Sequence, residues 1–389
     1  MRFRTPLARG TAVALTLALL AACGDDDTAS SDDDAGGDGG STSELAAACP
    51  ETVAVQTGWF PEAEYGPLYQ VIGEDGEIDG SAGAYRGEIG DSGVTFEVRA
   101  GGPFLGNTQA SAQLYLDDSL TMALIDTDEG IENIEEAPTT AVVSYMQVPP
   151  QAIIFDPDTY DFQEIGDVGE SDATVLVFEG STYQRWLIGA GLIREEQMDG
   201  SYTGAPDQFV SSQGEAVLGS GYASLEPYTF TQLPEWGKAL EAMLLYDAGY
   251  PIYGSSIAVR TDQLEDDREC LELLVPILQQ SIIDYMADPA GVNQVIVDLN
   301  TEIGDFWQTT IEQNDYAHDA LAGFGTFADG TDGVQGSFDA DRMQEILDTV
   351  VPVLEETGSD VPDDIAWEDF ATNEFLDTSI SAGVSAPGQ

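Results

Sequence analysis

Basic residues are scarce in this chain of 389 residues, which has 11 Lys and Arg against 72 Asp and Glu and a formal net charge of −61. Nucleic-acid binding depends on clustered Lys and Arg against phosphates, so the composition argues against that class. It argues equally against a polybasic module for anionic membrane surfaces. The chain is still 42% hydrophobic and 9% aromatic, which is enough for a core. A folded, strongly solvated protein therefore fits better than a disordered one.

Residues that carry the common catalytic and metal chemistries are also rare. The chain has one His (His318) and one Lys (Lys238), and no Cys-x-x-Cys or Cys/His cluster that would hold zinc. It lacks the G-x-S-x-G, H-E-x-x-H and P-loop motifs, so any ATPase it works with is a separate subunit. We therefore predict no enzymatic activity, no metal site and no cofactor.

No apolar run is long enough to span a membrane, but the N-terminus has the layout of an export signal. Arg2, Arg4 and Arg9 precede the apolar run 11–20, which is the length of a signal-peptide core. The run ends in Leu-Ala-Ala-Cys-Gly at 20–24, which resembles a bacterial lipoprotein cleavage site. We predict that residues 1–22 are a signal peptide and that Cys23 carries the lipid. The alternative is an ordinary signal peptide with a chance Cys.

An acidic, glycine-rich stretch follows at 24–43 and contains seven Asp. It has almost no apolar side chains to bury, and its like charges repel, so it is predicted to be a disordered tether. The acids do not follow the calcium-loop pattern. We assign residues 23–48 to the lipidated Cys and the tether. The folded protein would then be held on the outer, extracellular or periplasmic, side of the cell membrane.

Only Cys49 and Cys270 remain after Cys23. In an oxidising compartment, two Cys in a long chain suggest one disulfide, which would make the start of the folded part a neighbour of residue 270. Two unrelated buried thiols are the alternative.

Strand and helix patterns alternate up to about residue 260, and helical patterns dominate after it. The run 173–178 is apolar and β-branched, as expected of a strand buried on both faces of a parallel sheet. This order predicts an α/β protein with a helical C-terminal part. Strands are predicted at 53–55, 94–99, 119–125, 140–145, 151–155, 173–178, 216–218 and 252–260, and helices at 65–72, 110–116, 183–190, 236–245, 270–282, 292–307 and 341–354.

Four segments, in order, resemble the substrate-binding proteins of ABC importers. They are 57–69 (TGWFPEAEYGPLY), 113–128, 178–183 (FEGSTY) and 221–227 (GYASLEP). The likeness is to the subgroup that binds thiamine pyrimidines, sulfonates, taurine and nitrate. It implies a type II periplasmic-binding-protein fold with two lobes, two hinge crossovers and extra C-terminal helices. Lobe one would comprise 49–139 and 250–389, and lobe two 140–249, with the ligand held between them. The partners implied are a permease and an ATPase, with the binding protein itself a monomer.

The resemblance places the ligand site at the ends of the strands. Some of its residues have a second interpretation: Trp59 could be core, the segment 180–182 could only cap a helix, and Glu226 could be a surface acid. Phe60 and Tyr69 are expected in the core, and Glu62 and Glu64 could be surface acids. The predicted ligand-binding residues are Trp59, Tyr65, Gly180, Ser181, Thr182, Tyr183, Tyr222 and Glu226.

The pyrimidine binders usually begin this pattern with Asp-Trp and carry a His before the Gly-Leu-Tyr end, whereas this chain has Gly58 and Glu64-Tyr65 there. A phosphate-bearing pyrimidine is therefore not expected. Arg185 is the best candidate for holding an anion, but an acidic entrance would repel anions. We expect a neutral or cationic, partly planar ligand. A sulfonate or nitrate binder is the alternative, and a pyrimidine-synthesis-like enzyme or a surface adhesion lipoprotein are the alternatives of other classes.

Overall fold

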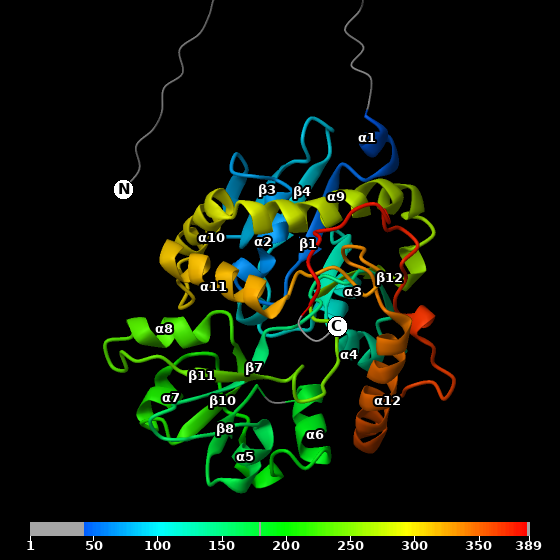
Figure 1. The fold of residues 1–389 in the computed structure, drawn as a ribbon. Helices are drawn as coiled ribbons and strands as arrows, with labels where there is room; N and C mark the ends of the chain where they lie inside the picture. The colour runs from blue at the N-terminus through cyan, green and yellow to red at the C-terminus, as the bar shows by residue number, and fades with distance from the viewer. Residues whose placement is uncertain (1–42, 179, 387–389) are drawn as a thin grey trace, which may run out of the picture. The chain divides into compact units, whose positions relative to one another are not determined.

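A computed structural model describes residues 43–178 and 180–386 (Figure 1). The predicted signal peptide, the lipidated Cys23 and most of the tether lie outside the described residues. Residues 44–48, which the prediction counted in the tether, instead form helix α1 (Glu44–Ala48), capped by the Ser43 side chain. Among the described residues, no helix is long and apolar enough to cross a membrane.

The first sheet has seven strands in the order β2-β3-β4-β1-β5-β12-β6. Its central strand β1 is buried on both faces and pairs in parallel with β4 and β5. Such burial is what an apolar, β-branched run produces when helices cover both faces of a parallel sheet. The strands are β1 (Thr52–Gln56), β2 (Glu77–Asp79), β3 (Ala84–Glu88), β4 (Thr95–Arg99), β5 (Met122–Ile125), β6 (Thr139–Val143) and β12 (Ser256–Arg260).

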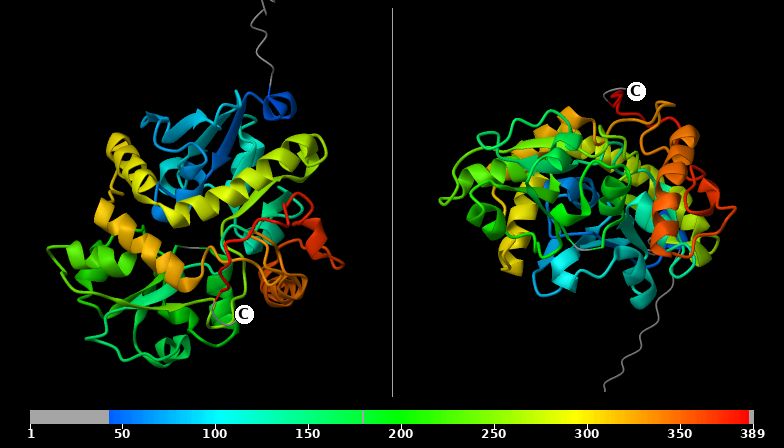
Figure 2. Two further views of the ribbon diagram at one scale, coloured as in Figure 1. Left: turned by 45° about the horizontal axis from the view of Figure 1, so that its top comes forward. Right: turned by 90° about the horizontal axis from the view of Figure 1, so that it is seen from below.

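The second sheet has five strands in the order β11-β7-β10-β8-β9. Figure 2 shows its green strands as a group separate from the blue strands of the first sheet. Its strands are β7 (Gln151–Phe155), β8 (Thr174–Leu176), β9 (Met198–Asp199), β10 (Ala216–Tyr222) and β11 (Glu241–Leu244). The chain thus enters this sheet after β6 and leaves it before β12, which confirms the two crossovers. Because β6 pairs with β12, the first crossover begins after Val143, later than the predicted boundary at 139/140.

The long helices pack against other helices and against the first sheet. Helix α9 contacts α1 and α2, α10 contacts α2 and α11, and α12 contacts both α4 and α6, as Figure 1 shows. The helices after α1 are α2 (Gly66–Gln70), α3 (Ala110–Leu116), α4 (Thr127–Glu132), α5 (Ile165–Glu170), α6 (Thr182–Gly189), α7 (Asp207–Ser211), α8 (Glu226–Gln232), α9 (Arg268–Ala287), α10 (Ala290–Ile303), α11 (Ile311–Phe324) and α12 (Ala340–Thr357). One hydrophobic cluster contains residues from both sheets and from α12.

The helix predicted at 236–245 is wrong, because residues 241–244 form β11 at the edge of the second sheet and pair antiparallel with β7. Ala242 and Leu244 pack into one hydrophobic cluster and Met243 into another, on alternate sides of the strand. An apolar run with both faces covered has no periodicity that separates strand from helix, so the pairing decided its structure.

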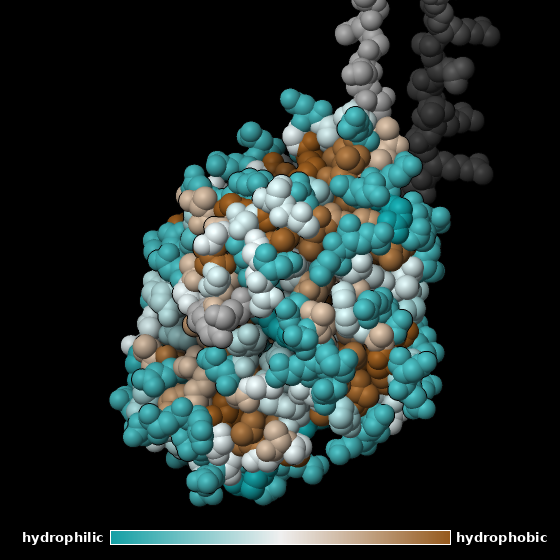
Figure 3. All heavy atoms as spheres, turned by 45° about the vertical axis from the view of Figure 1, so that its right-hand side comes forward, coloured by the Kyte–Doolittle hydropathy of each residue, from teal (hydrophilic) through white to brown (hydrophobic). Residues whose placement is uncertain are grey.

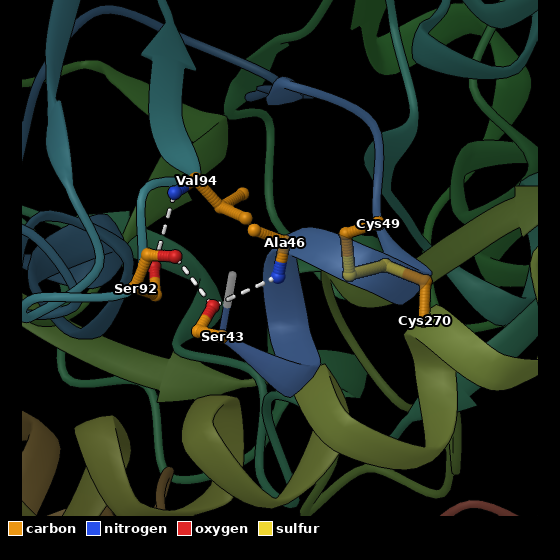
Figure 4. The surroundings of a disulfide bond; sticks show 6 residues. All are labelled: Ser43, Ala46, Cys49, Ser92, Val94 and Cys270. Carbon is orange, nitrogen blue, oxygen red and sulfur yellow. Dashed lines mark hydrogen bonds between the residues drawn. A yellow bond between two sulfur atoms is a disulfide. The ribbon is translucent and has the colours of Figure 1, made fainter. Parts of the chain in front are cut away.

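The Cys49–Cys270 disulfide is present, with the two Cα atoms 4.6 Å apart (Figure 4). Cys49 follows α1 directly and Cys270 lies in the first turn of α9. In the same region the Ser43 hydroxyl accepts a hydrogen bond from the Ala46 N–H at 3.0 Å and donates one to the Ser92 carbonyl. The disulfide therefore fixes the start of the folded part to the first long helix after β12.

Candidate ligand-binding site

A cavity of about 540 Å³ is lined by residues from segments of both sheets. This is within the usual range for a small-molecule site. The lining residues follow the carboxyl ends of parallel strands: β1 and β5 in the first sheet, and β8 and β10 in the second. Ligands of open α/β sheets bind at these ends, where the strands stop and the backbone turns away.

All eight residues predicted to bind a ligand line this cavity. Trp59 and Tyr65 come after β1, the segment 180–183 precedes and begins α6, and Tyr222 and Glu226 connect β10 to α8. The cavity thus brings together residues up to 167 positions apart in the chain, from Trp59 to Glu226. Whether each of them contacts a ligand stays a prediction.

Aromatic rings form one wall of the cavity. The Trp59 ring centroid lies 5.6 Å from that of Phe178 and 5.7 Å from that of Trp307, and Phe178 lies 5.4 Å from Tyr202. A Cβ atom at Gly102 would come within 2.7 Å of the Trp59 ring, and that glycine has a φ of +58°. The absence of a side chain there lets Trp59 occupy its position. Phe60 and Tyr69 are fully buried, as expected of core residues.

Six carboxyl groups line the cavity: Glu62, Asp126, Asp128, Glu129, Glu132 and Glu226. No Lys, Arg or His is among the described residues that line it. Glu62 is 5% exposed and Glu64, just behind it, is fully buried. The interpretation of these two as surface acids is therefore wrong.

Burial without a neighbouring cation favours the protonated form of a carboxyl. It raises the pKa of Glu226 to about 8 and that of Glu129 to about 7. The pKa of Glu62 is raised well above its ordinary value by burial first, and then by the charges of Glu64 and Glu226. Burial also raises the pKa of both Asp126 and Asp128, and the Asp126 charge raises that of Asp128 further.

Several of these carboxylates accept hydrogen bonds from backbone N–H groups around the cavity. The N–H of Ser111, in the first turn of α3, donates to Glu129 at 2.9 Å. The N–H of Ser255 donates to Asp126 at 2.6 Å, and that of Tyr222 donates to Glu226 at 3.0 Å. Three backbone N–H groups near the cavity are therefore already occupied by the chain's own carboxylates and are not available to an anionic ligand.

Segments from the two sheets also touch beside the cavity. The Ser224 hydroxyl, after β10, donates to the Glu64 carboxylate, after β1. Gln313 of α11 donates to the Thr229 hydroxyl of α8 at 3.2 Å.

Among the described residues, the basic candidates do not line the cavity, although Arg185 contacts two residues that do. Arg185 pairs with Glu132 at 3.5 Å and donates to the Gly180 carbonyl at 3.3 Å. Lys238 pairs with Asp156 at 2.7 Å and lies over the Trp236 ring. His318 packs edge-on against Tyr285 and is not among the described residues that line the cavity.

Sequence reasoning missed the four acids of the segment 126–132. Asp126 follows β5 directly, and Asp128, Glu129 and Glu132 belong to α4. Their position after a buried strand was a usable signal, since the same rule had selected Trp59 after β1. In a chain with 72 acids, however, acid residues alone do not stand out.

Among the described residues, no group of three or more His, Cys, Asp or Glu is arranged to hold a metal ion.

Comparison with protein-family models and with curated proteins finds no match for this sequence. Solved structures do match. The periplasmic aliphatic sulphonate binding protein SsuA from Escherichia coli superposes with a TM-score of 0.52 at 11% identity, covering 82% of this chain and 92% of that one. The alkanesulfonate-binding protein SsuA from Xanthomonas axonopodis pv. citri, bound to MOPS, gives 0.50 at 10% identity, with 83% and 98% covered.

The chain has the periplasmic-binding-protein fold. A putative sulfonate-binding SsuA from Methylobacillus flagellatus KT gives a similar match, with a TM-score of 0.51 at 10% identity, covering 83% of this chain and 92% of that one. The superpositions show a shared fold. The low sequence identities leave the identity of the ligand open. Within the periplasmic-binding-protein fold, the cavity described above is the place where segments of both sheets converge.

Proposed function

We propose that this protein is an exported solute-binding protein that captures a small molecule in the cavity and delivers it to an ABC importer. The permease and the ATPase would be separate subunits, since the sequence has no P-loop. A lipid on Cys23 would anchor the protein, as a monomer, to the outer side of the cell membrane. The shared fold and the lipoprotein-like leader support this proposal.

The lining of the cavity carries the proposal for the ligand class. Aromatic rings offer faces to a planar group, and six carboxyls with no lining Lys, Arg or His offer acceptors and negative charge. This combination suits a neutral or cationic, partly planar molecule. The eight predicted residues are its proposed contacts.

A sulfonate or nitrate binder is the alternative within this fold. It is favoured by the sulfonate-binding proteins among the matching structures and by the donors at 180–182, where Ser181 precedes α6 and its side chain makes no capping bond. Against it, the best-placed base, Arg185, is already paired with Glu132.

We propose no enzymatic activity. A pyrimidine-synthesis-like reaction of the kind considered above would use a Lys-bound cofactor and an active His. Lys238 and His318 both lie outside the cavity lining, and each contacts other groups. No feature of the described residues favours an adhesion lipoprotein over a binding protein.

The test is to purify the protein from an exporting host and examine it by native mass spectrometry, then release its bound molecules by denaturation. We expect a small molecule bound one to one and recovered unchanged. Recovery of a chemically altered molecule after incubation with that same compound would instead indicate an enzyme. Failure to bind any small molecule after refolding with a metabolite extract would contradict the proposal.

A further inference from the structure

We propose that the ligand is an organic cation whose positive charge is balanced by Glu62 and Glu226, with its apolar or planar part against the aromatic wall of Trp59, Phe178 and Trp307. This rests on the proposed function and narrows it, because a neutral ligand would serve that function equally well.

Glu62 and Glu226 come from different sheets and meet at the cavity. Glu62 follows β1 and immediately precedes the short 3-10 helix Ala63–Tyr65, and Glu226 is the first residue of α8 after β10. Both line the cavity, and they are close enough for the charge of Glu226 to act on Glu62. Among the described residues, neither makes an ion pair with a Lys, Arg or His (the pairs found involve other acids).

The other titratable groups facing this pair are acids and phenols. Among the described residues they are Glu64, Tyr65, Tyr69, Tyr202 and Tyr222, and Asp126 lies close enough to act on Tyr65 and Tyr222. Helix α11 packs against both the 3-10 helix and α8, but its own charged groups point elsewhere: Asp315 accepts from Asn293, and His318 lies against Tyr285. Within the part of the chain that the structure describes, no cation therefore balances Glu62 and Glu226.

Glu62 is buried and Glu226 is partly buried. Carboxyls that are largely removed from water and have no counter-charge either hold protons or bind a cation. A ligand cation that enters the cavity can replace those protons and release them to water. Its affinity then increases with pH over the range in which the empty site takes up protons, which for Glu226 centres on a pKa of about 8. A neutral ligand gains no such charge pairing.

The hydrogen-bond geometry favours the same sign of charge. The carboxylates of Asp126, Glu129 and Glu226 each accept a hydrogen bond from a backbone N–H with one oxygen. Those N–H groups are unavailable to an anionic ligand, and the carboxylates would repel it. A cation instead meets acceptors, and the indole faces of Trp59 and Trp307 attract it further.

The experiment compares three probes of one shape and different charge: benzamidinium, benzamide and benzenesulfonate. Their binding to the delipidated protein, freed of bound molecules, is measured by isothermal calorimetry. We expect benzamidinium to bind about tenfold or more tightly than benzamide, because a charged hydrogen bond discriminates by that much, and benzenesulfonate to bind most weakly. Benzamidinium stays cationic from pH 6 to pH 9, so its affinity should rise across that range while that of benzamide stays level.

Matched variants test whether the carboxyls of Glu62 and Glu226 balance the charge of the ligand. Glu62→Gln and Glu226→Gln keep the shape of the side chain and should each weaken benzamidinium about tenfold while leaving benzamide unchanged. Glu235→Gln removes an exposed acid outside the cavity and should alter neither. Circular dichroism of each variant confirms that it is folded.

Three outcomes would overturn the inference: benzamidinium binding no tighter than benzamide, including no binding by either; benzenesulfonate binding tightest; or benzamidinium affinity unaffected in both cavity variants. The bound molecule recovered from the exporting host separates this failure from that of the proposed function. A neutral or anionic recovered ligand overturns the cation alone, whereas the absence of any ligand counts against both.

Discussion

Burial raises the pKa of Glu226, and the hydrogen bond from the Tyr222 N–H lowers it. Burial has the larger effect. A carboxyl with a raised pKa stabilises the fold below its ordinary pKa and loses that contribution as the pH rises through the folded value. For Glu226 the window runs from the ordinary value of 4.5 to about 8. The empty protein therefore carries an internal cost near neutral pH that a bound cation could relieve.

Glu226→Gln should remove this cost. We expect the variant without ligand to be more stable than the wild type at pH 8 by about 1–3 kcal/mol, with the difference vanishing by about pH 4, below the ordinary value of 4.5. Urea unfolding at the two pH values measures it, and Glu235→Gln serves as the exposed control. Parallel pH profiles for wild type and Glu226→Gln would show that this carboxyl does not titrate as described.

Trp59 is the residue on which the aromatic wall depends, because it contacts both Phe178 and Trp307. Trp59→Ala should weaken binding of the recovered ligand by about 1–3 kcal/mol, as for other stacked rings, and reduce the change in Trp fluorescence on titration. Trp367→Phe, which lies outside the cavity lining, should leave both unchanged. Unaltered affinity in Trp59→Ala would remove Trp59 from the site.

Some helices and strands could be predicted from their own residues, whereas others depended on pairing with strands elsewhere in the chain. Strand β1 is a short apolar, β-branched run, and helix α3 buries Ala110 and Leu114 one turn apart, so both could be predicted from local pattern. Strand β11 was mistaken for a helix because it is decided by pairing with β7. Strands β2 and β3 were missed for a related reason: they are short, partly exposed and held by pairing with each other and with β4.

The disulfide joins two elements that are far apart in the chain, α1 and α9, across 221 residues. Replacing both Cys49 and Cys270 by Ala should lower the free energy of unfolding by about 2–4 kcal/mol, because the unfolded chain is no longer restrained. Urea unfolding measures the loss. Dithiothreitol should reproduce it in the wild type and have no effect on the double variant. An unchanged midpoint in the reduced wild type would contradict this role.

Over the whole molecule, acids greatly outnumber bases. In the described residues, every Lys and Arg except Arg342 pairs with a carboxylate, and Arg342 donates to the carbonyls of Pro251 and Ile252. Most acids are left without a cation. Hydrophilic side chains are spread over the face shown in Figure 3 rather than gathered in one patch. This distribution favours solvation of the whole surface, and its field attracts cations and repels anions.

Self-repulsion of this surface should make stability depend on salt. We expect the melting temperature to rise as NaCl is added from about 0.01 M to 1 M, over which the screening length falls from about 30 Å to 3 Å. Differential scanning calorimetry measures it, with sucrose of equal osmolality as the control for non-ionic effects. A flat response to NaCl would mean that the excess acids do not strain the folded state.

Residue types and local order were enough to establish the net charge, the leader pattern and the alternation of strands and helices. They suggested a disulfide between the two remaining Cys without excluding two separate thiols, and the family resemblance led to eight residues that line the cavity. Only the tertiary structure decided which acids matter. Glu62 and the acids at 126–132 look like any of the 72 until packing places them around one cavity whose described lining contains no base. Burial and the sign of neighbouring charges are properties of the assembled chain, because they depend on which distant residues pack together.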